Sequence, residues 1–375
     1  MCQLISNNIR PLTKSQGPFL FAVNNKISYY TYMRKIAKKL KRELSYQTGL
    51  YTTPPEFLSL IITTRCNFHC PACSIWEKQN NSELSTAEWQ KIIENLKLTL
   101  TPETFVEING GEPLLCLDLT LFLIKELKKY FKKVTLNTNG SLLNESVLNE
   151  LTLAGLDTIK ISFYSLDKSI HDSLRGQPGA FELADQAIKL ISQSSISLEV
   201  GLLLTTQNIK SAPELISYLQ TLPKTSIILQ PLDERVESVE SKSLNQNSIP
   251  VNLWPTKTQV LDFFNWLKSN FKNIKNSEAN IKATQEYYLD PVSVLKYRCF
   301  AGQRNLVVYP NADVCFCFKR PTVGNLLKQS LLTILKNTRL QRKGIKSCNK
   351  YCRIVGCNFS RGIKEYLTNL TRTSP

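Results

Sequence analysis

The sequence predicts an α/β protein built as a partial (β/α)6 TIM-like barrel, open on one side, with a small cysteine-rich domain at its C-terminal side. Two observations predict it: apolar strand-like runs alternate with helix-like segments from residue 56 to about 232, and six cysteines fall between residues 299 and 357. Such alternation is typical of βαβ units and of a parallel sheet.

Strands are expected at 58–63, 104–109, 133–138, 157–163, 197–205 and 225–230. Between them, helices are expected at 85–96, 118–131, 144–153, 180–193 and 212–221, the first opening on a capping box of Ser85 and Glu88. An amphipathic helix is expected near 256–271 and a basic one at 30–46, where Met33, Ile36, Leu40 and Leu44 recur at helical spacing. We expect four regions: a basic N-terminal extension (1–55), the barrel core (56–232), a linker or substrate-shaping insert (233–296) and the cysteine-rich domain (297–375).

Composition narrows the class of protein. The chain has 375 residues, of which 42% are hydrophobic and 21% charged, and its formal net charge is +17. It has no apolar run of the roughly 20 residues that a membrane span needs and no signal-peptide pattern, so we expect a cytoplasmic protein. The basic tail indicates an anionic partner or, more simply, a solvated face beside a negatively charged metal cluster.

Three cysteines, Cys66, Cys70 and Cys73, occur in the run Cys-x3-Cys-x2-Cys just after the first expected strand. Thiolates are the usual ligands of iron–sulfur clusters. Three of them leave one iron of a four-iron cluster open for a substrate. Structural zinc and free buried thiols are the competing interpretations of this spacing. Forty residues later, the second expected strand ends in Gly110-Gly111-Glu112-Pro113, where paired glycines allow the backbone to approach a ligand closely.

These two motifs together resemble the radical S-adenosylmethionine (SAM) superfamily, and the resemblance covers roughly residues 56–232 and the cysteine-rich tail. It implies that Cys66, Cys70 and Cys73 hold a [4Fe–4S] cluster whose open iron binds SAM. It also implies SAM contacts for a further set of residues, namely Gly110, Gly111, Glu112, Asn139, Ser162 and Arg175. The three cysteines, Gly110–Glu112, Asn139 and Ser162 are expected at the C-terminal ends of barrel strands, where active sites of such barrels lie. One departure is Ala72, which stands where the family usually has an aromatic residue.

The tail cysteines resemble the auxiliary-cluster extension called SPASM or twitch. Cys299 and Cys317 fit its pattern, with Ala312 at a position that is glycine in the family. There are too few thiols for two fully ligated auxiliary clusters, so we expect one [4Fe–4S] cluster. Its best four ligands are Cys299, Cys317, Cys348 and Cys352, with Cys315 and Cys357 as substitutes. One zinc ion is the alternative, because these spacings can also close a tetrahedral site.

The resemblance implies an oxidoreductase-type enzyme that cleaves SAM reductively to a 5′-deoxyadenosyl radical, which abstracts hydrogen from a substrate. Peptide maturation is the first interpretation. Cofactor or small-metabolite biosynthesis is the alternative, and RNA modification, suggested by the charge, is less favoured. Such an enzyme needs a flavodoxin- or ferredoxin-type electron donor. The sequence assigns no catalytic residue.

Overall fold

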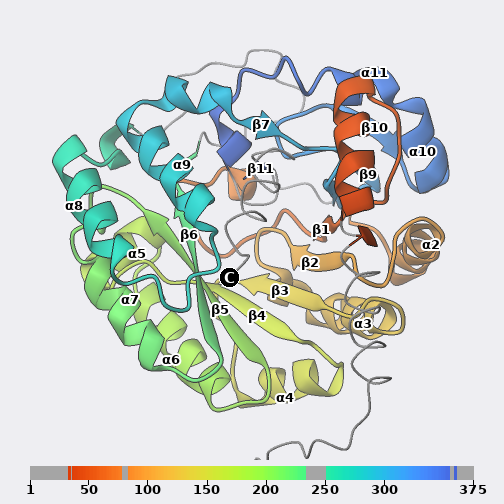
Figure 1. Ribbon diagram of the computed structural model, residues 1–375. Coiled ribbons are helices and arrows are strands. Elements are labelled where there is room, and N and C mark those ends of the chain that lie inside the picture. The colour runs from red at the N-terminus through yellow and green to blue at the C-terminus, as the bar shows by residue number, and fades with distance from the viewer. Residues whose placement is uncertain (1–32, 35, 78–82, 234–250, 355–358, 361–375) are drawn as a thin grey trace, which may run out of the picture.

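The computed structural model describes residues 33–34, 36–77, 83–233, 251–354 and 359–360. Figure 1 shows a curved sheet with helices packed on its outer face. The six core strands follow one another in space in chain order and are all parallel. They are β1 (Phe57–Ile61), β2 (Phe105–Asn109), β3 (Val134–Thr138), β4 (Thr158–Ser162), β5 (Ser197–Leu204) and β6 (Thr225–Pro231). This confirms the predicted α/β fold and its partial barrel.

The outer helices agree closely with the expected ones. They are α2 (Thr86–Lys97), α3 (Leu117–Lys128), α4 (Glu145–Leu153), α6 (Ala180–Ser192) and α7 (Ala212–Thr221). The capping box at Ser85 and Glu88 is present at the start of α2. The sequence missed α5 (Lys168–Arg175), whose eight residues are largely polar.

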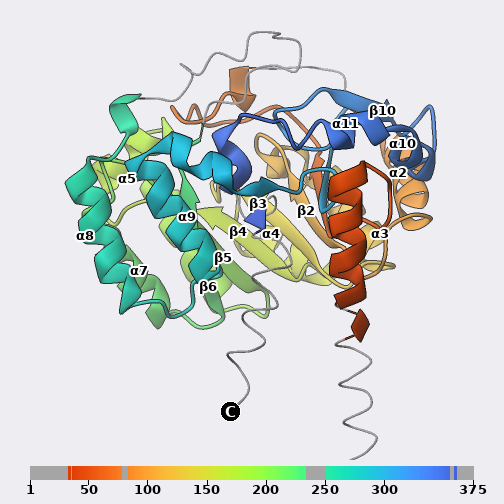
Figure 2. The same ribbon diagram turned by 45° about the horizontal axis from the view of Figure 1, so that its top comes forward.

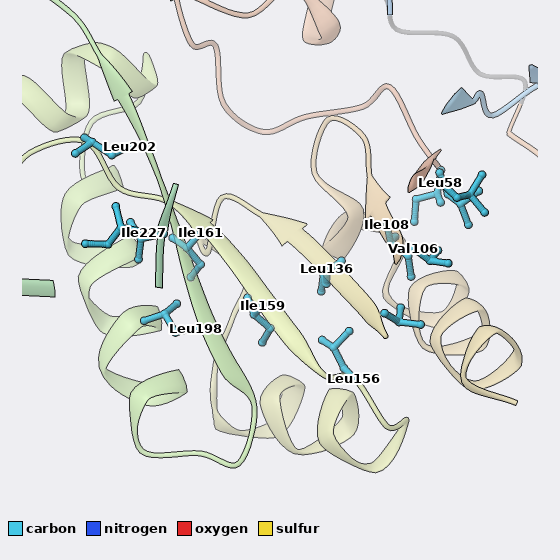
Figure 3. Close-up of a cluster of buried hydrophobic side chains, with 14 of the residues drawn as sticks. Leu58, Val106, Ile108, Leu136, Leu156, Ile159, Ile161, Leu198, Leu202 and Ile227 are labelled. Atoms are coloured by element: carbon cyan, nitrogen blue, oxygen red, sulfur yellow. The ribbon is translucent and has the colours of Figure 1, made fainter. Parts of the chain in front are cut away.

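The core lies between the strands and these helices. Alternate strand residues point to the helices and are fully buried, among them Leu58, Val106, Ile108, Leu136 and Ile159 (Figure 3). The other strand positions line the inside of the barrel and are largely polar, as at Ser59, Glu107, Asn109, Asn137 and Lys160. Because side chains alternate across a strand, one strand supplies both the core and the barrel interior.

The tail extends the core sheet instead of folding apart from it. Strand β8 (Asn305–Val308) pairs in parallel with β1, and β9 (Asp313–Cys315) and β10 (Thr322–Asn325) continue the sheet in antiparallel fashion. Ala312, in the turn between β8 and β9, has a φ of +68° and is buried. This left-handed conformation favours glycine and explains why glycine is expected there.

Residues 251–296 pack along the β6 side of the sheet as α8 (Lys257–Lys268) and α9 (Glu278–Leu289). Hydrogen bonds from Ile227 to Asn273 and from Leu229 to Asn276 attach this segment to β6. The remaining short elements are the 3-10 turns Ile75–Glu77, Pro113–Cys116, Val251–Leu253, Pro291–Lys296 and Tyr351–Ile354, the strand pair β7 (Arg298–Cys299) and β11 (Phe359–Ser360), and the helices α10 (Leu331–Asn337) and α11 (Arg339–Lys343). The four region boundaries expected from the sequence stay predictions.

No helix in the described part of the chain is long and apolar enough to cross a membrane.

Candidate functional site at the C-terminal end of the barrel

Cys66, Cys70 and Cys73 lie on one loop that leaves the C-terminal end of β1. The loop is closed by a hydrogen bond from Cys73 N to the Cys70 carbonyl at 3.0 Å. Trp76 Nε1 donates to the Cys73 carbonyl at 2.9 Å and to the Cys70 carbonyl at 3.4 Å. Its ring also meets His69 edge-on, with the ring centroids 4.8 Å apart. The loop is therefore ordered by its own backbone and by one tryptophan.

Two glycines outside the loop let it approach the barrel closely. A Cβ atom on Gly111 would lie 2.0 Å from the Arg65 carbonyl oxygen, and one on Gly176 would lie 2.2 Å from the His69 carbonyl oxygen. Gly111, in the glycine pair after β2, and Gly176, the C-cap of α5, thus both pack directly against the backbone of the cysteine loop. The geometry gives Gly111 a packing role; its predicted contact with SAM stays a prediction.

Glu112 is fully buried and holds the ends of β2 and β3 together. Its carboxylate accepts hydrogen bonds from Asn139 N and Thr138 Oγ1, both at 2.7 Å, and from Leu114 N at 3.0 Å. Burial raises its pKa, and these three donors oppose that rise. These bonds give Glu112 a role in positioning the ends of β2 and β3; its predicted contact with SAM stays a prediction.

Asn139 connects this cluster of polar groups to the cysteine loop. Its Nδ2 donates to Asn67 Oδ1 at 2.8 Å, and Asn67 Nδ2 donates to Ser141 Oγ at 2.9 Å. Asn67 is one of the three residues between Cys66 and Cys70, and the sequence gave no reason to select it. The β3–α4 turn therefore orients the same loop that carries the cysteines.

Arg175, at the end of α5, faces the cysteine loop with a buried guanidinium. It lies over the rings of Phe68 (5.4 Å) and Tyr164 (5.2 Å), and its Nη1 donates to Tyr164 Oη at 3.2 Å. Burial alone would lower its pKa, but Cys70, Tyr164 and Cys66 together raise it. Among the described residues its Nε has no hydrogen-bond partner. A buried cation with an open donor beside two thiols suits an anionic ligand.

Ser162 is the last residue of β4 and is partly exposed on the inside of the barrel. The structure thus places Cys66, Gly110, Asn139 and Ser162 just at or beyond the ends of four adjacent strands. Arg175 joins them through α5.

His171 lies one turn before Arg175 and is buried. Its Nδ1 accepts the Tyr164 backbone N–H at 3.2 Å, and burial together with Arg175 lowers its pKa to about 3. The imidazole is neutral at physiological pH, and it supports the Tyr164 backbone beneath the guanidinium.

Three thiols on one loop are the usual kind of ligand for an iron–sulfur cluster. Burial raises the pKa of the Cys66 thiol to about 11, so without metal this sulfur is protonated and binding must release a proton. As the side chains stand, no three His, Cys, Asp or Glu residues converge closely enough to hold a metal ion in the part of the chain that is described. The case for the three thiols as ligands rests on their spacing, their shared loop and the partners around it.

Four tail cysteines gather in one region. Cys299 and Cys348 lie close enough to Cys317 to raise its pKa, and Cys317 and Cys299 do the same for Cys352. Burial raises the pKa of Cys317 to about 12 and that of Cys352 well above its ordinary value. These are the four that the sequence ranked first.

The two substitute cysteines differ. Cys315 packs with Ile61 and Val307 in a separate apolar cluster and approaches Thr322 Oγ1 at 3.9 Å. This environment is typical of a packed thiol. Cys357 lies outside the described residues.

Two further polar groups were missed by the sequence. Arg65, next to Cys66, binds the Glu83 carboxylate through Nε (2.9 Å) and Nη2 (2.8 Å), and its Nη2 also lies 2.9 Å from Cys116 Sγ. Thr63 Oγ1 donates to the same carboxylate. The spacing of these residues does not predict the Arg65–Glu83 contact, because Glu83 lies beyond the far end of the cysteine loop and is brought back to Arg65 by the path of the chain.

The second group is a row of charges inside the barrel. Lys160 Nζ lies 3.2 Å from Glu107 and 3.8 Å from Glu199, and Lys275 pairs with the other oxygen of Glu199. Asn109 Nδ2 donates to Glu107 at 3.1 Å and to Ser59 Oγ at 2.7 Å, and its Oδ1 accepts from Asn137 at 3.0 Å. Single charges within apolar strand runs, as at Glu107, Lys160 and Glu199, are the signal that could have predicted this polar interior.

Comparison with known proteins agrees with this geometry. The family profile of the radical SAM superfamily matches residues 60–219, and that of SPASM, an iron–sulfur cluster-binding domain, matches residues 299–358. The first domain implies SAM and a [4Fe–4S] cluster, and the second implies auxiliary iron–sulfur clusters.

Among curated proteins, the chain is 29% identical to a PqqA peptide cyclase of Granulibacter bethesdensis over 175 residues, which cover 46% of each protein. It is 31% identical to a probable GTP 3′,8-cyclase of Methanopyrus kandleri over 163 residues, or 43% of this chain and 52% of the relative. The chain thus spans about half the length of the curated relatives it matches.

Among solved structures, SuiB of Streptococcus suis bound to SAM has a TM-score of 0.62 at 17% identity, covering 85% of this chain and 73% of that one. The anSMEcpe structure with bound AdoMet and the Cp18Cys peptide has a TM-score of 0.57 at 16% identity, covering 82% of this chain and 89% of that one. These likenesses show the fold. The chain thus contains a radical SAM domain at residues 60–219 and a SPASM iron–sulfur cluster-binding domain at residues 299–358.

Proposed function

We propose that this protein is a radical SAM enzyme of peptide maturation. The observation that carries the proposal is the cysteine loop at the C-terminal end of β1, gripped by Gly111 and Gly176 and faced by the buried guanidinium of Arg175. When bound, the cluster and SAM supply a 5′-deoxyadenosyl radical that abstracts hydrogen from an unactivated carbon.

The residues of the chain have distinct roles in this proposal. Cys66, Cys70 and Cys73 hold the cluster, while Arg175 and Ser162 bind SAM together with Gly110, Gly111 and Asn139. Glu112 fixes the β2 and β3 ends and so sets where these groups stand. The buried Phe68 and Tyr164 rings both pack against the guanidinium and exclude water from it.

In the tail, Cys299, Cys317, Cys348 and Cys352 hold one auxiliary [4Fe–4S] cluster. Bound there, this cluster would supply an electron acceptor for the reaction or an anchor for the substrate. A flavodoxin- or ferredoxin-type donor in the cytoplasm reduces the first cluster, and the basic surface of the tail attracts an anionic partner.

Support for a peptide substrate comes from the kinds of protein that the chain resembles. One is named a peptide cyclase, and SuiB was solved with its precursor peptide SuiA, at a TM-score of 0.61 and 16% identity. A second candidate is a cyclisation in cofactor biosynthesis, which the similarity to the GTP 3′,8-cyclase favours.

The test is to incubate the reconstituted protein with SAM, a reductant and short peptides encoded beside its gene, and to follow peptide mass. The proposal expects a peptide that loses or exchanges hydrogen, together with stoichiometric 5′-deoxyadenosine. GTP consumption with no change in any peptide would replace peptide maturation by the second candidate.

A further inference from the structure

The helix that ends at Thr48, described at residues 33–34 and 36–48 and red in Figures 1 and 2, lies beside the tail elements α10 and α11. One of its faces is attached to the rest of the protein. On that face Arg42, Ser45 and Tyr46 are buried. Tyr46 stacks on Phe300 with ring centroids 4.8 Å apart, and Arg298 Nη1 binds both Glu43 carboxylate oxygens at 2.7 and 2.8 Å. These contacts fix which side of the helix faces outward.

The opposite face exposes an apolar line. Met33 is 42% exposed, Leu40 54% and Leu44 51%, and the exposed Ala37 stands between them. Spacings of four, three and four residues are those of the a and d positions of a coiled coil. We call Met33, Ala37, Leu40 and Leu44 the outer seam.

The outer seam is flanked by positive charge. Arg34 and Lys41 are exposed one residue after Met33 and Leu40, where e or g positions fall. At the C-terminal end of the helix, Arg339 Nε donates to the Thr48 carbonyl at 3.2 Å and Lys346 Nζ to Gln47 at 2.8 Å, so tail cations continue the basic border. The one acid of the described helix, Glu43, is already paired with Arg298.

The apolar line and the positive flank of the outer seam limit which kinds of molecule can bind there. An antiparallel second copy of the same helix would bring Arg34 and Lys41 against their own kind, and a parallel copy would set Lys41 against Ile36. Neither arrangement supplies an acid to these cations. A membrane surface needs a broad apolar face, whereas the outer seam is one residue wide. A single helix with apolar a and d residues and acidic flanks could pack on the outer seam and pair its acids with the flanking cations.

Resting on the proposed peptide substrate, we infer that the outer seam is the docking surface for an acidic amphipathic helix in that peptide. The docked segment belongs to the same peptide as the segment that reacts. It raises the local concentration of the linked reacting segment without entering the site.

A designed peptide tests the seam directly. The probe is a fluorescent peptide of about three heptads with Leu at a and d and Glu at e and g, mixed with the reconstituted full-length protein at low salt. Fluorescence anisotropy is expected to show binding that weakens with salt, and a version with Lys at e and g is expected not to bind. The double variant Leu40→Glu/Leu44→Glu is expected to weaken binding about tenfold or more.

The matched control is Leu98→Glu/Leu153→Glu, which changes two leucines that are each 85% exposed elsewhere on the barrel helices. It is expected to bind the probe like the unchanged protein. The inference is overturned if the acidic peptide fails to bind, or if the seam variant and the control bind it equally. It is also overturned if the seam instead mediates dimers in sedimentation or binds vesicles of phosphatidylserine.

SAM cleavage without peptide, measured in the same preparations, separates this inference from the proposed function. It is expected to continue in the seam variant. If SAM is cleaved but the probe peptide does not bind, only the docking surface is refuted. If the unchanged protein does not cleave SAM, the proposed function is refuted.

Discussion

At the scale of single residues, the site depends on close backbone approaches more than on side-chain contacts. Gly111 is the clearest case, since a Cβ there would meet the Arg65 carbonyl oxygen at 2.0 Å and the Cys66 Cβ at 2.9 Å. Both contacts are too short to be relieved by a rotamer change. The cysteine loop itself would have to move.

We therefore expect Gly111→Ala to displace the loop and to lower the iron content of the barrel site after anaerobic reconstitution. The expected loss of stability is several kcal/mol, in the range of severe steric substitutions (about 4 kcal/mol or more). The control Gly344→Ala places its Cβ at an ordinary 3.4 Å from two carbonyl oxygens and is expected to keep full iron content. Equal iron content in both variants would contradict the packing role of Gly111.

Arg175 carries the second prediction at this scale. Arg175→Gln removes the buried cation beside Cys66 and Cys70 and is expected to weaken SAM binding by about tenfold or more. Tyr164→Phe removes only the 3.2 Å hydrogen bond and keeps the ring, so a much smaller effect is expected. SAM titration of the two reconstituted variants, followed by the cluster spectrum, measures the difference. Similar SAM affinities for the two would refute a direct role for the guanidinium.

At the scale of elements, the barrel strands combine an apolar outer face with a charged interior. Burial alone would raise the pKa of Glu107, but Lys160 and Asn109 hold it below its ordinary value. A carboxylate with a lowered pKa stabilises the fold above its unfolded pKa of about 4.5, and this contribution fades as the pH falls through and below that value.

Lys160→Met leaves Glu107 without its cation and Glu199 with Lys275 alone. We expect a loss of up to about 3 kcal/mol at pH 7, because the side chains of the pair are 12% and 23% exposed and so are not fully buried, and a smaller difference from the unchanged protein near pH 4. The control Lys129→Met breaks a pair with Glu126 whose lysine is 63% exposed, so a loss below about 1 kcal/mol is expected. Urea unfolding at the two pH values checks both. A pH-independent loss would show that charge pairing is not the cause.

The elements also show what could be predicted from sequence. The six core strands and the helices between them were predictable because their apolar residues recur at periods of two and 3.6. Helix α5 was not, since it has only two apolar residues, Ile170 and Leu174, and its buried His171 and Arg175 are polar. The pairing of β8 with β1 was equally hidden, because partners almost 250 residues apart leave no local pattern.

The site divides in the same way. The cysteines and the glycine pair are recognisable because they recur at fixed spacing along the chain. The path of the loop after the cysteines brings Arg65, Glu83 and Cys116 together. Asn67 belongs to the site because it is hydrogen-bonded to Asn139. Such contacts depend on the three-dimensional path of the backbone, which a local pattern does not encode.

At the scale of the whole molecule, the tail strands are one sheet with the barrel, so the two cysteine sets are held in a single framework. We predict that Cys317→Ser or Cys352→Ser removes the tail metal, lowering reconstituted iron from about eight to about four atoms per chain. The control Cys315→Ser changes a packed thiol and is expected to keep both sites. Zinc that persists at one atom per chain in the unchanged protein would replace the auxiliary cluster.

The central claim is that the β1 loop binds a cluster that cleaves SAM. The most direct measurement is 5′-deoxyadenosine production by the anaerobically reconstituted protein with SAM and dithionite, compared with Cys70→Ala. We predict slow formation of 5′-deoxyadenosine by the unchanged protein and none by the variant. A protein with its full iron content that forms no 5′-deoxyadenosine would contradict the account.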